Sequence, residues 1–145
     1  EALESAINLF PNNTRLMLGL AMEYQQQGQQ DKAKASYEQL ISLSPNNPVV
    51  LNNLAWLYYE AGDDRAMDTA RAAYELVPDN AAVVDTYGWI LFESGERQRS
   101  LEVLEKAHEL DPTSREIAMH LVEAYRATGR DDDARRILAK MDAGA

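Results

Sequence analysis

The chain has 145 residues, of which 46% are hydrophobic and 26% charged, a composition ordinary for a globular chain with a core. Twenty-four acidic residues against 14 basic ones give a formal charge of -10. This charge disfavours nucleic acid as a partner, because phosphates would be repelled, and favours a partner with some basic character. Cysteine is absent, which excludes a disulfide framework, a thiolate metal site and a cysteine nucleophile. No apolar run reaches the roughly 20 residues that a membrane span needs.

The sequence repeats with a period of 33 or 34 residues. Proline followed by small polar residues recurs in the phrases NLFPNN, SLSPNN, ELVPDN and ELDPTS. Proline cannot continue the helix before it, and an asparagine or serine shortly after it can cap the next helix. These caps are Asn13, Asn47, Asn80 and Ser114. A glycine suited to a left-handed helix C-cap stands midway in each period, at Gly28, Gly62, Gly95 and Gly129.

Each period therefore predicts two helices. In chain order we expect a helix at 1–10 that is the second helix of a truncated unit (1–13), and then four units. Unit one (14–47) has helices at 14–27 and 30–43, and unit two (48–80) has helices at 48–61 and 64–77. Unit three (81–114) has helices at 81–94 and 97–110, and unit four (115–145) has helices at 115–128 and 131–141. We expect 141–145 to fray, and the half unit at the start suggests a piece of a longer array.

Small and large side chains alternate at fixed places in each unit. The seventh and eighth places of the first helices read Leu20-Ala21, Leu54-Ala55, Tyr87-Gly88 and Leu121-Val122. The second helices carry Ala33, Ala66, Ser100 and Ala134 at matching places. The pattern resembles the tetratricopeptide repeat (TPR) family over nearly the whole chain. The resemblance implies an all-α, right-handed superhelical solenoid of antiparallel helix hairpins that binds proteins and is not an enzyme.

In the TPR family, ligand contacts come from fixed places on the concave face of the first helices. Carried over to this sequence, those places give a candidate partner-binding groove and no cofactor. Its residues are Met22, Asn52, Asn53, Trp56, Tyr59, Asp85, Trp89, Phe92, Met119, His120 and Arg126.

The most informative feature of this groove is aromatic. Trp56 and Trp89 share one place in adjacent units, and Tyr59 and Phe92 share the place three residues later, on the same helical face. We therefore expect a patch of four rings, flanked by methionines, where a peptide would bind. Packing of the tryptophans against neighbouring units is an equally good interpretation, and for Tyr59 and Phe92, near the ends of their helices, packing is favoured over ligand contact. The two asparagines are more typical of bonds to solvent or to a neighbouring hairpin than of ligand contacts.

One TPR subclass is disfavoured. Chaperone-binding TPR domains hold a C-terminal carboxylate with a clamp of basic and amide side chains. Here the basic places hold Leu18, Ala82 and Thr86. A chaperone adaptor is therefore not expected.

Catalytic and metal chemistry find little support in the sequence. Glu116, His120 and Glu123 share a helical face and are compatible with a divalent metal, but the spacing is common on solvated acidic helices, which we favour. No nucleophile elbow and no phosphate-binding loop is present.

A looser resemblance concerns the phrases LNNLAW and DTYGW. They are similar to the C-terminal repeats of bacterial exosortase/PEP-CTERM TPR lipoproteins and of related polysaccharide-export scaffolds. That resemblance implies a periplasmic or outer-membrane-associated scaffold; without it, a cytoplasmic location is equally compatible.

Three hypotheses follow for the function. The first is a binding module that takes a partner segment in its groove. The second is a structural spacer that self-associates through the truncated N-terminal end, where Leu3 and Ile7 lack a covering helix. The third and most remote is a metal-dependent activity near His120.

Overall fold

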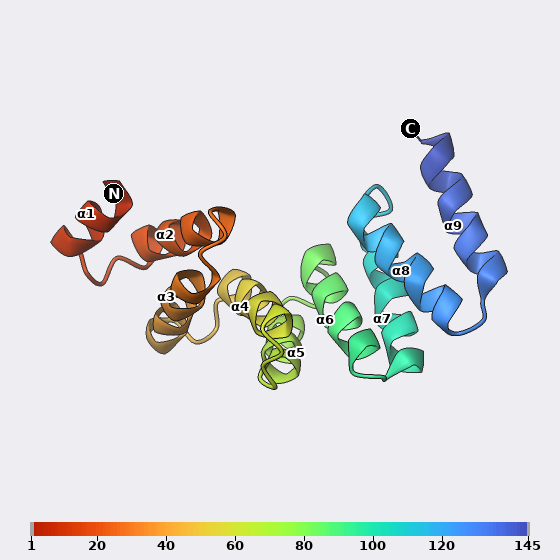
Figure 1. Cartoon of the computed structure of the whole chain (residues 1–145), viewed down its shortest axis with the longest axis horizontal. Coiled ribbons are helices and arrows are strands. Elements are labelled where there is room, and N and C mark those ends of the chain that lie inside the picture. The colour runs from red at the N-terminus through yellow and green to blue at the C-terminus, as the bar shows by residue number, and fades with distance from the viewer. Residues whose placement is uncertain (1, 145) are drawn as a thin grey trace. The chain divides into compact units, whose positions relative to one another are not determined.

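A computed structural model describes residues 2–144, and within them all regular secondary structure is helical. The chain divides into two compact units, residues 1–76 and 77–145 (Figure 1). The first contains α1 (Ala2–Leu9), α2 (Thr14–Gln26), α3 (Gln30–Leu43), α4 (Pro48–Glu60) and α5 (Ala66–Leu76). The second contains α6 (Ala81–Glu93), α7 (Arg97–Leu110), α8 (Arg115–Ala127) and α9 (Asp131–Ala143). The predicted all-helical class is confirmed.

The residues predicted to begin and end the helices of each repeat take those roles in the structure. The side chains of Asn13, Asn47, Asn80 and Ser114 each accept a hydrogen bond from a backbone N–H in the first turn of the following helix. Gly28, Gly62, Gly95 and Gly129 all have positive φ, between 67° and 91°. Most residues avoid this conformation, so glycine is what allows each first helix to stop and reverse into the second.

Helices α2/α3 and α4/α5 form hairpins in the first unit, and α6/α7 and α8/α9 do so in the second (Figure 1). Helices α6 and α7 approach closely at Gly88. A Cβ built on Gly88 would lie 2.8 Å from Cδ2 of Leu104, so only glycine fits there without a shift. The hydroxyl of Ser100, which is fully buried, donates a 2.8 Å hydrogen bond to the carbonyl of Gly88. This bond explains why a serine is tolerated where the repeat usually has alanine.

Two helix boundaries differ from the prediction by two residues, and the others agree to within one. Helix α5 begins at Ala66 rather than 64, because the Asp63 carboxylate caps the backbone N–H of Arg65 at 2.9 Å and holds a turn there. Helix α9 continues to Ala143, two residues beyond the predicted end at 141, and the predicted fraying of 141–145 stays a prediction. Met141 is partly buried against the core of the second unit, which anchors this last turn. Residue 145, also predicted to fray, and residue 1 of the first predicted helix lie outside the described residues.

The second unit has an apolar core of its own. In the second unit the core joins α7, α8 and α9, and its buried members are Leu101, Leu104, Ala118, Leu121, Val122, Ala124, Tyr125, Ala134 and Ile137. None of the helices in residues 2–144 combines the length and apolar character that a membrane crossing requires.

Candidate functional site

The predicted groove residues all lie on the first helices of the hairpins, but they divide between the two compact units. Helices α2 and α4 carry Met22, Asn52, Asn53, Trp56 and Tyr59, and helices α6 and α8 carry Asp85, Trp89, Phe92, Met119, His120 and Arg126. The predicted patch of four rings spans both units, so it stays a prediction. Each half has a geometry of its own.

In the first unit, Trp56 and Tyr59 form a ring pair on α4. Their ring centroids are 5.3 Å apart at an angle of 49°, and both side chains are partly exposed. The indole Nε1 of Trp56 donates to the Glu60 carboxylate at 3.0 Å. This bond lies within one turn of the same helix and fixes the rotamer of the tryptophan. On α2 of the same unit, Met22 is 42% exposed.

The asparagines of α4 have structural surroundings. The Nδ2 of Asn53 donates to the hydroxyl of Tyr37 on α3 at 3.2 Å, and this hydroxyl donates to Oε1 of Gln25 on α2 at 2.8 Å. Tyr37 is fully buried, so the chain of bonds satisfies its hydroxyl. Asn53 thus bonds to the neighbouring hairpin. The Oδ1 of Asn52 is buried and has no hydrogen-bond partner among the described residues.

In the second unit, Trp89 lies in a stack of three rings. Its centroid is 5.1 Å from that of Phe92 at 27°, and 4.4 Å from that of the His120 imidazole at 20°. Both contacts are close to parallel, the offset arrangement that aromatic rings favour. Trp89 remains only partly buried. Trp89 therefore packs within the chain and also keeps part of its surface open to solvent.

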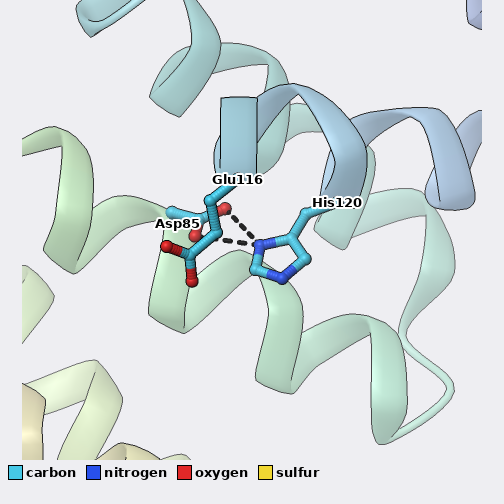
Figure 2. Close-up of side chains that lie close together, drawn as sticks. All are labelled: Asp85, Glu116 and His120. Carbon is cyan, nitrogen blue, oxygen red and sulfur yellow. Dashed lines mark hydrogen bonds and ion pairs between the residues drawn. The ribbon is translucent and has the colours of Figure 1, made fainter. Parts of the chain in front are cut away.

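His120 joins this stack to a buried carboxylate. Its Nδ1 lies 2.9 Å from both carboxylate oxygens of Asp85 on α6. Asp85 is 5% exposed, which is unusual for a carboxylate. The carboxylate of Glu116, one turn before His120 on α8, points toward the same place (Figure 2). One ligand atom from each of the three side chains lies within 4.8 Å of the other two.

The preference for a solvated His120 is wrong. The side chain is only 15% exposed, because Trp89 covers one face and Asp85 binds its Nδ1. The third member of the cluster is Asp85 rather than the predicted Glu123, which is exposed. A signal existed in the sequence: Asp85 and His120 are 35 residues apart, one repeat plus one residue, so their helices place them side by side. The remaining predicted positions in this unit differ in burial, since Arg126 is exposed and Met119 half-buried.

In a second arrangement, which the sequence analysis missed, a tyrosine of α4 or α8 contacts a glutamate of the preceding hairpin and a nearby arginine. The hydroxyl of Tyr58 donates to Glu38 of the preceding hairpin at 2.8 Å, and the Arg65 guanidinium lies 4.3 Å from the tyrosine ring centroid. The second unit repeats the arrangement with Tyr125, Glu105 and Arg130, at 2.9 and 4.7 Å. Burial, followed by the nearby carboxylate, raises the pKa of both tyrosines to about 12. In both units the glutamate precedes the tyrosine by 20 residues, and this recurring separation in the sequence is a signal from which the two hydrogen bonds could have been predicted.

Two protein-family models match the repeating part of this chain. Residues 91–144 match the family described as Tetratricopeptide repeat, and residues 21–62 match a second one described as TPR repeat. The two matches include the turn glycines Gly28, Gly62, Gly95 and Gly129 and the caps Asn47 and Ser114. The chain belongs to the TPR family. A search of curated protein sequences gives no match.

Several solved structures share this TPR fold. A crystal structure of MamA protein has a TM-score of 0.80 at 21% identity, covering 97% of this chain and 77% of MamA. MamA 41-end from Desulfovibrio magneticus RS-1 has a TM-score of 0.85 at 15% identity, covering 97% and 80%. The first TPR of Spaghetti (RPAP3), bound to the HSP90 peptide SRMEEVD, has a TM-score of 0.73 at 21% identity, covering 80% and 93%. At these identities the likeness concerns the fold alone.

Proposed function

We propose that this TPR chain is a non-enzymatic scaffold that binds a segment of a partner protein on the exposed face of its first helices. The observation that carries the proposal is the pair of rings at one repeat position on α4 and on α6, Trp56/Tyr59 and Trp89/Phe92. All four side chains are partly exposed. Aromatic side chains that are held rigid lose little entropy on binding, which suits them to be anchors for a partner.

The charge around the rings indicates the chemistry of the partner. In the second unit, Asp85 and Glu93 lie on α6 with Trp89, and Glu116 and Glu123 lie on α8 with His120, which stacks on Trp89. The whole chain carries a formal charge of -10. A segment with apolar side chains for the rings and with lysine or arginine nearby would complement this surface. We therefore propose a basic, partly apolar segment.

The RPAP3 structure supports peptide binding by this fold, but its peptide differs in charge from the basic segment proposed here. Its peptide, SRMEEVD, is acidic and ends in a carboxylate. The basic places of a carboxylate clamp hold Leu18, Ala82 and Thr86 in this chain, and the Thr86 hydroxyl donates to the backbone of its own helix at 3.0 Å. None of these side chains can neutralise an acidic tail. The proposal therefore excludes this peptide class.

The test is selection of binders from a displayed random-peptide library, followed by affinity measurement with two matched double variants. Trp56→Ala with Trp89→Ala removes the rings from the first helices. Leu43→Ala with Leu110→Ala removes comparable exposed apolar side chains, 48% and 39% exposed, from second helices. We expect the first variant to weaken binding by about thirtyfold or more, as loss of hot-spot residues does, and the second to bind normally.

Circular dichroism and thermal melts accompany this comparison, because Trp89 also packs within the chain. The proposal fails if the tryptophan variant remains folded and binds as the wild type does. It also fails if the leucine variant loses affinity to the same degree, since the effect would then not belong to the first-helix face.

We propose further that the parent assembly belongs to a bacterial envelope or polysaccharide-export system. The support is the likeness of the phrases LNNLAW and DTYGW to repeats of such scaffolds. Protease accessibility in intact cells, spheroplasts and lysates of the source bacterium tests it. A full-length protein that is digested only after lysis of the inner membrane contradicts an envelope location.

A second candidate function, self-association through the N-terminal end, has one specific observation in its favour. Leu9 and Phe10, at the end of α1, are 75% and 61% exposed, and α1 contains no buried residue. Sedimentation velocity over a range of concentrations tests it. A strict monomer, or an oligomer that persists in the variant with Leu9→Ser and Phe10→Ser, excludes assembly through this end.

A further inference from the structure

We propose that Asp85, Glu116 and His120 form a binding site for a divalent transition-metal ion of the Zn²⁺ type. The three side chains converge from two helices, one from α6 and two from α8 (Figure 2). The proposal is independent of the peptide-binding function and concerns a property that the TPR fold does not itself imply.

The chemistry and the spacing of the donor atoms suit such an ion. One imidazole nitrogen with two carboxylates is a mixed ligand set that Zn²⁺ and its neighbours accept. Zinc lies about 2.0–2.2 Å from such ligands, which places the ligand atoms about 3 to 3.5 Å from one another. In this structure the Nδ1 of His120 is 2.9 Å from the Asp85 oxygens, and no pair in the set exceeds 4.8 Å. Small side-chain rotations close the remaining difference.

The electrostatics of the cluster favour a cation. Asp85 is buried, yet its only hydrogen-bond donor among the described residues is the Nδ1 of His120. A carboxylate has about four acceptor positions, so most of its capacity is unused. Glu116 adds a second carboxylate and forms no ion pair with a lysine or arginine in residues 2–144. Two carboxylates around one imidazole leave net negative charge in a partly buried place, and a divalent ion would compensate it.

Two of the three ligands are preorganised. The imidazole of His120 is held in plane by its stack on Trp89, 4.4 Å between centroids, and Asp85 is held by burial between packed helices. Glu116 precedes His120 by four residues, the spacing that puts both on one helix face. Because Glu116 is exposed, it can swing onto an entering ion, and the fourth position of the ion would face solvent.

Calorimetric titration of the chelator-stripped full chain with Zn²⁺ tests the ligand set. Three variants remove one ligand each: Asp85→Asn, Glu116→Gln, and His120→Phe, which keeps a ring on Trp89. Glu123→Gln is the matched control, since it removes an exposed carboxylate from the next turn of α8. We expect one ion per chain for the wild type and the control, at least about tenfold weaker binding for Glu116→Gln, and none for His120→Phe.

Tryptophan fluorescence tests whether the metal binds beside Trp89. In a Trp56→Phe background, Trp89 is the only tryptophan, and Cu²⁺ or Ni²⁺ bound at His120 would quench its emission. Glu116→Gln is the decisive variant, because it alters an exposed ligand and leaves the buried Asp85–His120 pair in place. The proposal is overturned if neither heat nor quenching appears at millimolar metal. It is equally overturned if Glu116→Gln binds like the wild type, or if Glu123→Gln loses as much affinity as Glu116→Gln.

Discussion

Replacement of Gly88 by alanine tests the account of how the α6/α7 hairpin packs. The new methyl group would lie 2.8 Å and 2.9 Å from Cδ2 and Cγ of Leu104, and 3.2 Å from Cγ1 of Val103. Carbon atoms favour separations of about 3.5–4.0 Å, so Leu104 must move by roughly 0.7 Å. Leu104 is fully buried in the core of the second unit and has little room to move. Overpacking of this kind costs about 1–3 kcal/mol.

The alanine also brings a gain, because glycine inside a helix costs about 0.5–1 kcal/mol relative to alanine. The net expectation for Gly88→Ala is a loss of about 1 kcal/mol in the free energy of unfolding. Gly19 provides the matched control in the middle of α2. A Cβ there would lie 3.7 Å from the nearest carbon of Leu3, an ordinary contact. Gly19→Ala should therefore keep only the helical gain and raise stability by about 0.5–1 kcal/mol.

Urea unfolding followed by circular dichroism measures both variants, and the emission of Trp89 in a Trp56→Phe background reports on the second unit alone. A double-mutant cycle with Leu104→Ala isolates the clash: the leucine truncation should relieve much of the cost of Gly88→Ala. The reasoning is refuted if Gly88→Ala stabilises the chain as Gly19→Ala does, or if the cycle shows no coupling.

Three further outcomes are expected. Burial and the Glu105 carboxylate raise the pKa of Tyr125 to about 12, against about 10 when unfolded, so only the unfolded state loses the proton between those values. The stability that this group contributes is therefore present below pH 10 and is lost as pH rises toward 12. Between pH 9 and 11 the loss is about 1 kcal/mol, so the urea midpoint of Tyr125→Phe should fall less over this range than that of the wild type. Asn47→Ala should lower the free energy of unfolding by about 1 kcal/mol because two backbone N–H groups lose their acceptor, whereas Asn46→Ala should change it little. The peptide SRMEEVD at millimolar concentration should give no shift in amide NMR signals, and saturable shifts would contradict the absence of a carboxylate clamp.

The fold was predictable because its determinants are local. The proline, the capping residue and the glycine act within a few residues of their own positions, and each recurs four times, so the helix boundaries follow closely from the sequence. The errors occur where a contact intervenes. Asp63 holds a turn that delays the start of α5, and Met141 packs against the core of the second unit at the predicted end of α9, which continues to Ala143. Neither effect follows from helix propensity.

The candidate site was only partly predictable, because it depends on which residues of neighbouring hairpins meet. Repeat position placed Asp85, Trp89 and His120 on the binding face. It did not show that the imidazole inserts between a tryptophan and a buried carboxylate. Periodicity along α8 pointed to Glu123 as the partner, whereas the packing of α8 on α6 selects Asp85. A reading that compares positions one repeat apart would find this pair.

The two proposals for the first-helix face interact, and their interaction can be measured. Without an ion, Asp85 and Glu116 make the surface beside Trp89 acidic, and a basic segment suits it. A bound divalent ion would neutralise both carboxylates and weaken that attraction, so metal and peptide should oppose one another. By linkage, a peptide that weakens metal binding by some factor is itself weakened by the metal by the same factor. Titrations in both orders should give equal factors, and this opposition should disappear in His120→Phe, which is expected to bind no metal.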